Sequence, residues 1–207
     1  MSDYTLAPCS TLLCGMTGSG KTTFALRYLL NVQAACRFVF DDLGQIAARL
    51  KLPHAATAAE LEAALSTRWV IFNPHRMFPG DVAAAFRFFC QWSFDCARRG
   101  PGKKVFLADE VWRWCSPQAI PREFAALAQM GRAENLELMT ATQLPHKVNA
   151  SVTGQATEVV CFRLDEPLAL SRMRELGGDP EAVKNLPLGN FVAWNRLSGG
   201  RLTGKLF

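Results

Sequence analysis

The segment from Gly15 to Thr22 reads Gly-Met-Thr-Gly-Ser-Gly-Lys-Thr and fits the pattern G-x-x-x-x-G-K-[ST]. It follows the apolar run Thr11–Cys14 and precedes a helical stretch, which is the context that this motif requires. Glycines let consecutive backbone N–H groups turn inward around phosphate oxygens, and the next helix adds the positive end of its dipole. The segment therefore predicts a phosphate-binding loop between a strand and a helix.

The residue types in this loop suit Mg·ATP, so we expect ATP and Mg²⁺ as cofactors. Lys21 can reach the β and γ phosphates, and the hydroxyl of Thr22 can ligate the magnesium ion. The residues expected to contact the nucleotide are Gly15, Met16, Thr17, Gly18, Ser19, Gly20, Lys21, Thr22 and Thr23.

Short β-rich apolar runs alternate with helical patterns along the chain, which is typical of a mostly parallel sheet with helices on both faces. We expect an α/β fold of the P-loop NTPase (RecA/ASCE-like) kind, with residues 1–207 forming a single domain. The expected strands are Thr11–Gly15, Arg37–Phe40, Trp69–Phe72, Lys104–Ala108, Leu136–Thr142, Glu158–Leu164, Asn190–Asn195 and Arg201–Phe207. The expected helices are Lys21–Ala35, Thr57–Leu65, Asp81–Arg98, Pro121–Ala133 and Pro167–Leu176.

Two apolar strands end in a pair of acids, and either could supply the metal-binding carboxylate. The strand before Asp41 and Asp42 comes only one helix after the loop, so it directly follows the loop's own crossover. We prefer the strand before Asp109 and Glu110, in which Asp109 holds Mg²⁺ through water and Glu110 activates the attacking water. The acids of the first strand are then expected to be strand-end acids near the nucleotide.

A third apolar strand, Leu136–Thr142, ends at Gln143. Because the carboxyl ends of parallel strands share one edge of an open α/β sheet, Gln143 should arrive beside Glu110 and the γ phosphate. A neutral amide there can orient water or report the loss of phosphate. The residues alone thus nominate Lys21, Glu110 and Gln143 for catalysis.

Composition argues against several other kinds of site. The seven cysteines are scattered and odd in number, so we expect reduced core thiols and no disulfide framework. No Cys-x-x-Cys pair and only three distant histidines leave no zinc site to propose. We expect neither a transmembrane helix nor a secretory signal. The net charge of +5 permits a polyanion partner without establishing one.

The segment Arg132–Pro145 carries the most specific resemblance to a known family. Its order of Arg-Ala, a strand and Ala-Thr-Gln-x-Pro resembles the HerA and FtsK superfamily of DNA-translocating ring ATPases. The match continues through Phe162–Leu164, Ser171–Arg172 and Leu188–Phe191, so the resemblance covers most of the chain. Leu144 is a departure, since FtsK proteins usually carry Arg after the Gln.

This resemblance implies a homo-oligomeric ring, with six subunits favoured over five, that hydrolyses ATP to translocate double-stranded DNA. It assigns Arg132 to the neighbouring subunit's ATP site as a catalytic cation, with Arg163 and Arg172 as lesser candidates for that contact. Without the family, Arg132 would be interpreted as a helix-end cation favoured by the dipole.

Chain length favours one group of proteins within the superfamily that the chain resembles. Few residues precede Gly15 and none follow the final strands, so we expect a bare motor core. Such a core is similar to the genome-packaging ATPases of membrane-containing, tailless icosahedral viruses. It would act in the cytoplasm of an infected host cell or on the virion, with capsid-vertex or membrane proteins of the virion as further partners.

Three segments leave alternatives open. The basic run Arg98–Lys104 should lie at the sheet edge opposite ATP, as a solvated turn or as a DNA or capsid docking site. The loop Trp112–Pro117 either grips DNA with its aromatic and cationic tips or buries its aromatics. The helix Asp81–Arg98 is apolar around most of its circumference, so it is buried by its own chain, which we favour, or partly covered by another subunit.

Two other functions fit the same loop. A small-molecule kinase would need an acceptor pocket and an Arg-rich lid, and we find no such lid. A phage morphogenesis or secretion ATPase resembling the zonula-occludens-toxin group would usually be tethered to a membrane, which the expected lack of a membrane helix disfavours.

Overall fold

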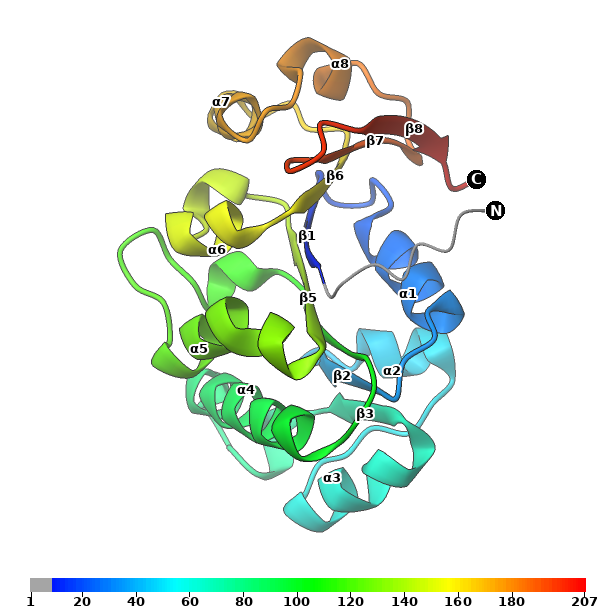
Figure 1. Ribbon diagram of the computed structural model, residues 1–207, viewed down its shortest axis with the longest axis vertical. Helices are drawn as coiled ribbons and strands as arrows, with labels where there is room; N and C mark the ends of the chain where they lie inside the picture. Colours follow the sequence, from blue (N-terminus) through cyan, green and yellow to red (C-terminus); the bar gives the residue numbers. More distant parts are fainter. Residues whose placement is uncertain (1–8) are drawn as a thin grey trace.

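The protein folds around one eight-stranded sheet in a computed structural model that describes residues 9–207 (Figure 1). The strand order is β3-β2-β4-β5-β1-β6-β7-β8, and the first six of these strands pair in parallel, while β7 and β8 are antiparallel. The strands are β1 (Ser10–Cys14), β2 (Cys36–Phe40), β3 (Trp69–Phe72), β4 (Lys104–Ala108), β5 (Leu136–Thr142), β6 (Glu158–Phe162), β7 (Asn190–Asn195) and β8 (Arg201–Lys205).

Helices connect these strands and confirm the predicted α/β class. The α-helices are α1 (Lys21–Asn31), α2 (Gln45–Leu50), α3 (Ala58–Ala64), α4 (Val82–Arg99), α5 (Arg122–Met130), α6 (Ala150–Gln155), α7 (Pro167–Glu175) and α8 (Pro180–Lys184). The 3-10 turns are η1 (Leu65–Thr67), η2 (Pro74–Arg76), η3 (Val111–Arg113), η4 (Gly131–Glu134) and η5 (Pro145–Lys147). The short helices α2, α6 and α8 were not predicted, because five or six residues are too few to display a helical period.

Alternate strand residues build a separate core on each face of the sheet. In β2, Phe38 and Phe40 pack with α4 and α5, whereas Val39 packs with α1 and α2. Figure 1 shows α1 and α2 on one side of the sheet and α4, α5 and α6 on the other. Helices α7 and α8 complete the α4 side over β1 and β6. The helical crossovers thus cover both faces of the parallel strands, as predicted.

Helix α4 owes its long apolar surface to burial within its own chain. Phe86 and Phe89 are fully buried, and Phe88 and Trp92 pack against the same core while remaining half-buried. The Phe86 ring lies 5.2 Å from that of Phe40 and the Phe89 ring 5.6 Å from that of Phe106. The chain itself therefore covers the Phe86 and Phe89 face of this helix, as we favoured from the sequence.

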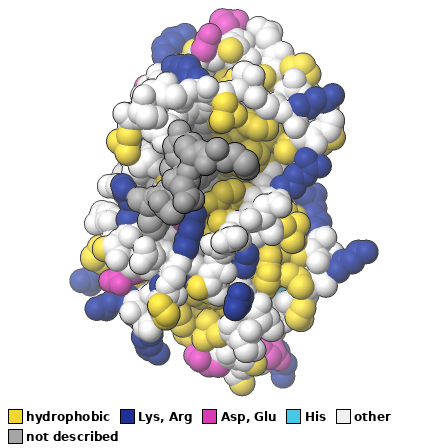
Figure 2. Space-filling view, turned by 45° about the vertical axis from the view of Figure 1, so that its right-hand side comes forward, with side chains coloured by type: hydrophobic (Ala, Val, Ile, Leu, Met, Phe, Trp, Pro, Cys, Tyr) yellow, Lys and Arg dark blue, Asp and Glu magenta, His cyan; other side chains and the backbone are white. Residues whose placement is uncertain are grey.

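The basic run at the amino end of β4 is half internal, which corrects the idea of a wholly solvated or docking segment. Lys104 is buried, and its ammonium donates to the carbonyls of Ala97 at 2.8 Å, Glu134 at 3.2 Å and Gly100. Lys103 pairs with the buried Glu137 at 2.6 Å. These two cations hold the sheet edge together. Figure 2 shows Lys and Arg side chains spread over one face instead of gathered in one patch.

Cysteine chemistry follows from burial. All seven cysteines lie within the described residues and are free thiols, as expected. Burial raises the pKa of Cys115 to about 12, so this thiol stays protonated at neutral pH.

Residues 9–207 contain no cluster of three His, Cys, Asp or Glu side chains that could hold a metal ion. Nor does any helix among them have the length and apolarity needed to span a membrane.

Candidate nucleotide-binding and hydrolytic site

The phosphate loop leaves β1 through a turn in which glycine is required sterically. A Cβ on Gly15 would lie 2.5 Å from Ser19 Oγ and 2.7 Å from Phe162 Cβ. Gly20 has a φ of 124°, and a Cβ there would come within 2.9 Å of both Phe162 Cε1 and Leu206 Cδ1. The loop backbone therefore lies directly on β6 and the C-terminal segment, and α1 begins at Lys21.

We expect Gly20→Ala to lower the free energy of unfolding by roughly 2–4 kcal/mol, because a positive φ and steric overlap each disfavour a side chain. Gly18→Ala is the matched control, since Gly18 has a φ of 76° but no heavy atom within 4 Å of a new Cβ. The control should cost only about 1–2 kcal/mol, the conformational penalty alone. Urea unfolding of the two variants checks this, and equal losses would mean that the Phe162 and Leu206 side chains simply move aside.

The loop presents donors that fit polyphosphate oxygens. Helix α1 starts without a side-chain cap, so its first N–H groups are available at the positive end of the helix dipole. Ser19 Oγ is buried and has no hydrogen-bond partner among residues 9–207. Thr23 lies in the first turn of α1 and is half-buried. The Gly15–Thr23 segment, here called the cradle, thus combines unpaired donors with a helix N-terminus.

Lys21 occupies the centre of this cradle. Its side chain is 6% exposed, and Nζ donates to the carbonyls of Gly15 at 2.8 Å and Met16 at 3.2 Å. Nζ also lies 3.8 Å from Glu110 Oε1. The ammonium therefore lies between the loop and the predicted catalytic carboxylate, where a γ phosphate would need charge stabilisation.

Thr22 meets the acid that we prefer for metal binding. Thr22 Oγ1 donates to Asp109 Oδ2 at 3.1 Å, although the two residues lie on α1 and after β4. A hydroxyl beside a carboxylate is an oxygen-rich pair suited to Mg²⁺, which these residues could hold together with phosphate oxygens and water. The structure therefore brings Asp109, and neither Asp41 nor Asp42, to the loop.

Glu110 turns its carboxylate into the site through an unusual backbone conformation. Its φ is 47°, in the left-handed region, and its N–H donates to Asp109 Oδ1 at 2.9 Å. Non-glycine residues rarely adopt this region, and such strain gathers at functional sites. The two neighbouring acids thus separate into a metal-side carboxylate and a second carboxylate facing Lys21.

Gln143 lies beside Glu110, as the order of strands predicted. Its N–H donates to Glu110 Oε2 at 3.3 Å, and its side-chain Oε1 accepts from Thr17 Oγ1 at 2.5 Å. Gln143 therefore joins the tip of the phosphate loop, through its side chain, to the carboxylate beyond β4, through its backbone. This contact joins residues from β5, β4 and the loop at one edge of the sheet.

The three arginines implied by the family resemblance occupy different places. Arg132 is exposed on η4, at the amino end of β5, and makes no side-chain hydrogen bond or ion pair within the described part of the chain. Arg163 follows β6, and its carbonyl accepts the Met16 N–H at 2.9 Å, so it lies beside its own chain's loop. Arg172 bonds Thr153 Oγ1 at 2.5 Å and pairs with Glu175, which commits it within its own chain.

Asp41 and Asp42 have structural partners, which corrects their expected place near the nucleotide. Asp41 is buried and accepts the Ala47 N–H at 2.8 Å at the start of α2. Asp42 pairs with Arg113 at 2.6 Å. Strand β2 is separated from β1 by β4 and β5, so neither acid reaches the cradle.

The C-terminal strands support the loop, and sequence reasoning assigned them no such role. The Gly189 N–H donates to Ser19 O at 3.3 Å, and the Leu206 N–H donates to Gly189 O at 2.9 Å. Arg27 of α1 donates to Leu206 O at 2.7 Å. The only sequence signal at this place was the Leu-Gly-Asn-Phe block, whose contact with the loop depends on the β6-β7-β8 meander.

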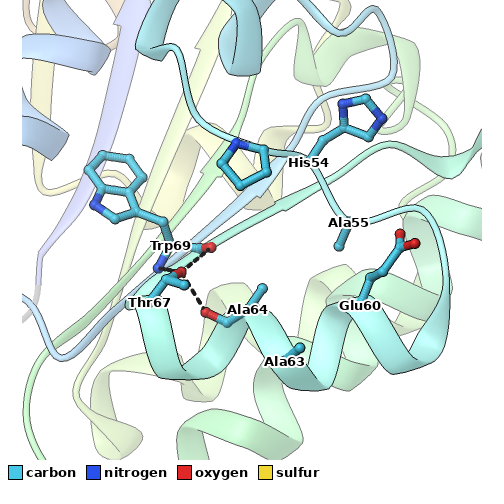
Figure 3. Close-up of a pocket in the computed structure, with 8 residues that line it drawn as sticks. His54, Ala55, Glu60, Ala63, Ala64, Thr67 and Trp69 are labelled. Atoms are coloured by element: carbon cyan, nitrogen blue, oxygen red, sulfur yellow. Dashed lines mark hydrogen bonds between the residues drawn. The ribbon is translucent and has the colours of Figure 1, made fainter.

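A separate pocket lies at the far edge of the sheet, where η1 leads into β3 (Figure 3). Thr67 Oγ1 donates to Ala64 O at 2.8 Å beside it, and the Trp69 N–H donates to Thr67 Oγ1 at 3.2 Å. The pocket carboxylate, Glu60, accepts the Ala56 N–H at 2.7 Å and lies 3.7 Å from Arg76. Glu60 and Thr67 thus have local partners, and the pocket takes no part in the loop's site.

The fold of this chain matches those of solved proteins, although its sequence matches no family. No protein-family model and no curated protein matches the sequence. Among solved structures, the genome-packaging NTPase B204 from Sulfolobus turreted icosahedral virus 2, in complex with ATP-gammaS, superposes with a TM-score of 0.78. The two share 19% identity over 96% of this chain and 98% of that chain. The chain has the fold of B204.

Two further solved structures share this fold at lower sequence identity. VirB4 of Thermoanaerobacter pseudethanolicus matches with a TM-score of 0.68 and 13% identity, over 96% of this chain and 89% of that chain. The monomer form of the pCW3 conjugation coupling protein TcpA, solved with ATPgS, matches with a TM-score of 0.65 and 14% identity. The match covers 99% of this chain and 61% of that chain. These neighbours therefore share the α/β fold that the family resemblance implied.

Proposed function

We propose that this protein is an ATPase that forms a homo-oligomeric ring and translocates double-stranded DNA. The observation that carries the ATPase assignment is the convergence of Lys21, Thr22, Asp109, Glu110 and Gln143 on one cradle. The fold shared with B204 supports the finer assignment to viral genome packaging. A packaging motor would act in the cytoplasm of an infected host cell or on the virion, next to capsid-vertex or membrane proteins.

In the proposed reaction each residue has a separate task. The loop N–H groups and Lys21 bind and orient the phosphates, and Thr22 and Asp109 would hold Mg²⁺, which would neutralise phosphate charge. Glu110 accepts a proton from the attacking water, because its Oε1 lies 3.8 Å from Lys21 Nζ and so faces the place of the γ phosphate. Gln143 orients that water or senses phosphate loss through its bond to Thr17.

The position of Arg132 supports the ring that the family resemblance implies. The seven residues of β5 separate it from Gln143 by about 23 Å, at roughly 3.3 Å per residue, so it cannot reach its own cradle. In the proposed ring this exposed guanidinium enters the ATP site of an adjacent copy, where a cation stabilises charge on the transferring phosphoryl. We favour six subunits over five.

The proposal predicts that duplex DNA stimulates phosphate release by the purified protein. We expect steady-state ATPase activity to rise with double-stranded DNA and the stimulation to fall steeply with added salt, since phosphate contacts are ionic. Light scattering in a non-hydrolysable ATP analogue should report a ring. A protein that remains monomeric with analogue and DNA, and transfers the terminal phosphoryl to nucleosides or nucleotides, would instead be a small-molecule kinase.

A further inference from the structure

Trp112 is directed at the proposed catalytic carboxylate. Its indole Nε1–H donates to Glu110 Oε2 at 2.8 Å, the same oxygen that accepts the Gln143 N–H at 3.3 Å. The ring is half-buried against the α4 core, and Lys147 Nζ lies 5.8 Å from its centre. Trp112 is therefore turned inward to the site, which agrees with the alternative that this loop buries its aromatics.

The two donors bind the same carboxylate oxygen and leave the other oxygen open to the cradle. Oε2 is occupied by Trp112 and Gln143, while Oε1 faces Lys21 Nζ at 3.8 Å. Holding one oxygen fixes the rotation of the carboxylate, and the other oxygen is then presented to the phosphate cradle. Fixed orientation of a reacting group is a large part of what enzymes supply beyond binding.

We infer that Trp112 is a positioning residue that orients Glu110 for proton abstraction. The inference rests on the proposed function, since it presumes hydrolysis with Glu110 as the base. In the step it supports, the water oxygen bonds to the γ phosphorus, the water proton passes to Glu110 Oε1, and ADP leaves with the electron pair of the broken bond. The indole stays protonated and touches no reacting atom.

Trp114 offers a matched comparison two residues away. Its ring stacks on Phe86 at 5.3 Å with an interplanar angle of 18°, and it lies edge-on to Phe40 at 5.5 Å. Its Nε1 has no hydrogen-bond partner among the described residues. Trp114→Phe therefore makes the same chemical change as Trp112→Phe without removing a bond to Glu110.

We expect Trp112→Phe to lower kcat for ATP hydrolysis by about tenfold while KM stays within about twofold, because the loss concerns proton abstraction and not nucleotide binding. Trp114→Phe should keep the wild-type kcat. In a Glu110→Gln background, Trp112→Phe should cause no further loss, since the group it orients is gone. Steady-state phosphate release and binding of a fluorescent ATP analogue provide both readouts.

If the wild-type protein hydrolyses ATP and Trp112→Phe has the same kcat, the inference is overturned and the proposed function stays intact. A loss that appears as raised KM, or that persists in full in the Glu110→Gln background, would overturn it too. Wild-type protein without any hydrolysis would instead count against the proposed function. Should Trp112→Phe not bind the analogue because it misfolds, Trp112→Leu, which also lacks the donor, is judged by the same criteria.

Discussion

Lys21→Ala is expected to abolish ATP hydrolysis, with a fall in kcat of at least about 10²–10³-fold, the cost of removing one preorganised charge partner. The ammonium bonds two loop carbonyls and lies 3.8 Å from Glu110, so no other cation within the described residues occupies the centre of the cradle. Phosphate release under saturating ATP measures the effect. The loop should also loosen, by about 1–3 kcal/mol, because two buried carbonyls lose their donor.

Lys184→Ala is the control for Lys21→Ala, since Lys184 is an exposed lysine at the end of α8. It should hydrolyse ATP like the wild type. Thermal unfolding separates loss of chemistry from loss of fold, because the destabilisation expected for Lys21→Ala leaves most of the protein folded at low temperature. A Lys21→Ala protein within tenfold of wild-type activity would rule out the phosphate-binding role of this loop.

Arg132→Ala should be as inactive in hydrolysis as Lys21→Ala yet bind nucleotide almost normally. A cation delivered from a neighbouring subunit is worth about 10³–10⁵ in rate and contributes mainly to the transition state. Arg132 is exposed at the amino edge of the sheet, away from its own cradle, so its loss leaves the described loop contacts untouched. Single-turnover hydrolysis and equilibrium binding of an ATP analogue distinguish the two effects.

Mixing the two inactive variants tests delivery in trans. In a mixed ring, a Lys21→Ala subunit still supplies Arg132 to the intact cradle of an Arg132→Ala neighbour, so activity should return above either variant alone. Arg122→Ala, which changes an exposed arginine at the other end of α5, is the control and should stay active. If assembled Arg132→Ala rings hydrolyse ATP at the wild-type rate, the role assigned to Arg132 is wrong.

The sequence predicted those parts of the site that depend on local patterns or on the order of strands and helices. The Gly15–Thr22 segment follows β1 and runs into the first turn of α1 as expected, since glycine spacing and apolar flanks are local signals. Asp109, Glu110 and Gln143 were also placed correctly, because parallel strands bring their carboxyl ends to one edge. That inference needs only the order of strands and helices, without knowledge of any side-chain contact.

Other features lay beyond any local pattern. Lys103 and Lys104 read as surface charge, yet they bind Glu137 and buried carbonyls, because the α4 to β4 turn folds back on η4 and β5. For Trp112 the sequence left burial and DNA contact as alternatives, and only the structure shows its indole bonded to the Glu110 carboxylate, next to the left-handed backbone of that residue. Charge and hydropathy describe a residue but do not identify its partner.

What the amino-acid order determined by itself is the phosphate loop, the alternation of strands and helices and the edge at which the acids emerge, since each depends on backbone preferences over a few residues. Only the tertiary structure decided that Thr17 bonds Gln143, 126 positions away, and that Gly189 and Leu206 close over the loop. Such contacts are chosen by packing between elements distant in sequence, and packing is a property of the whole assembled sheet.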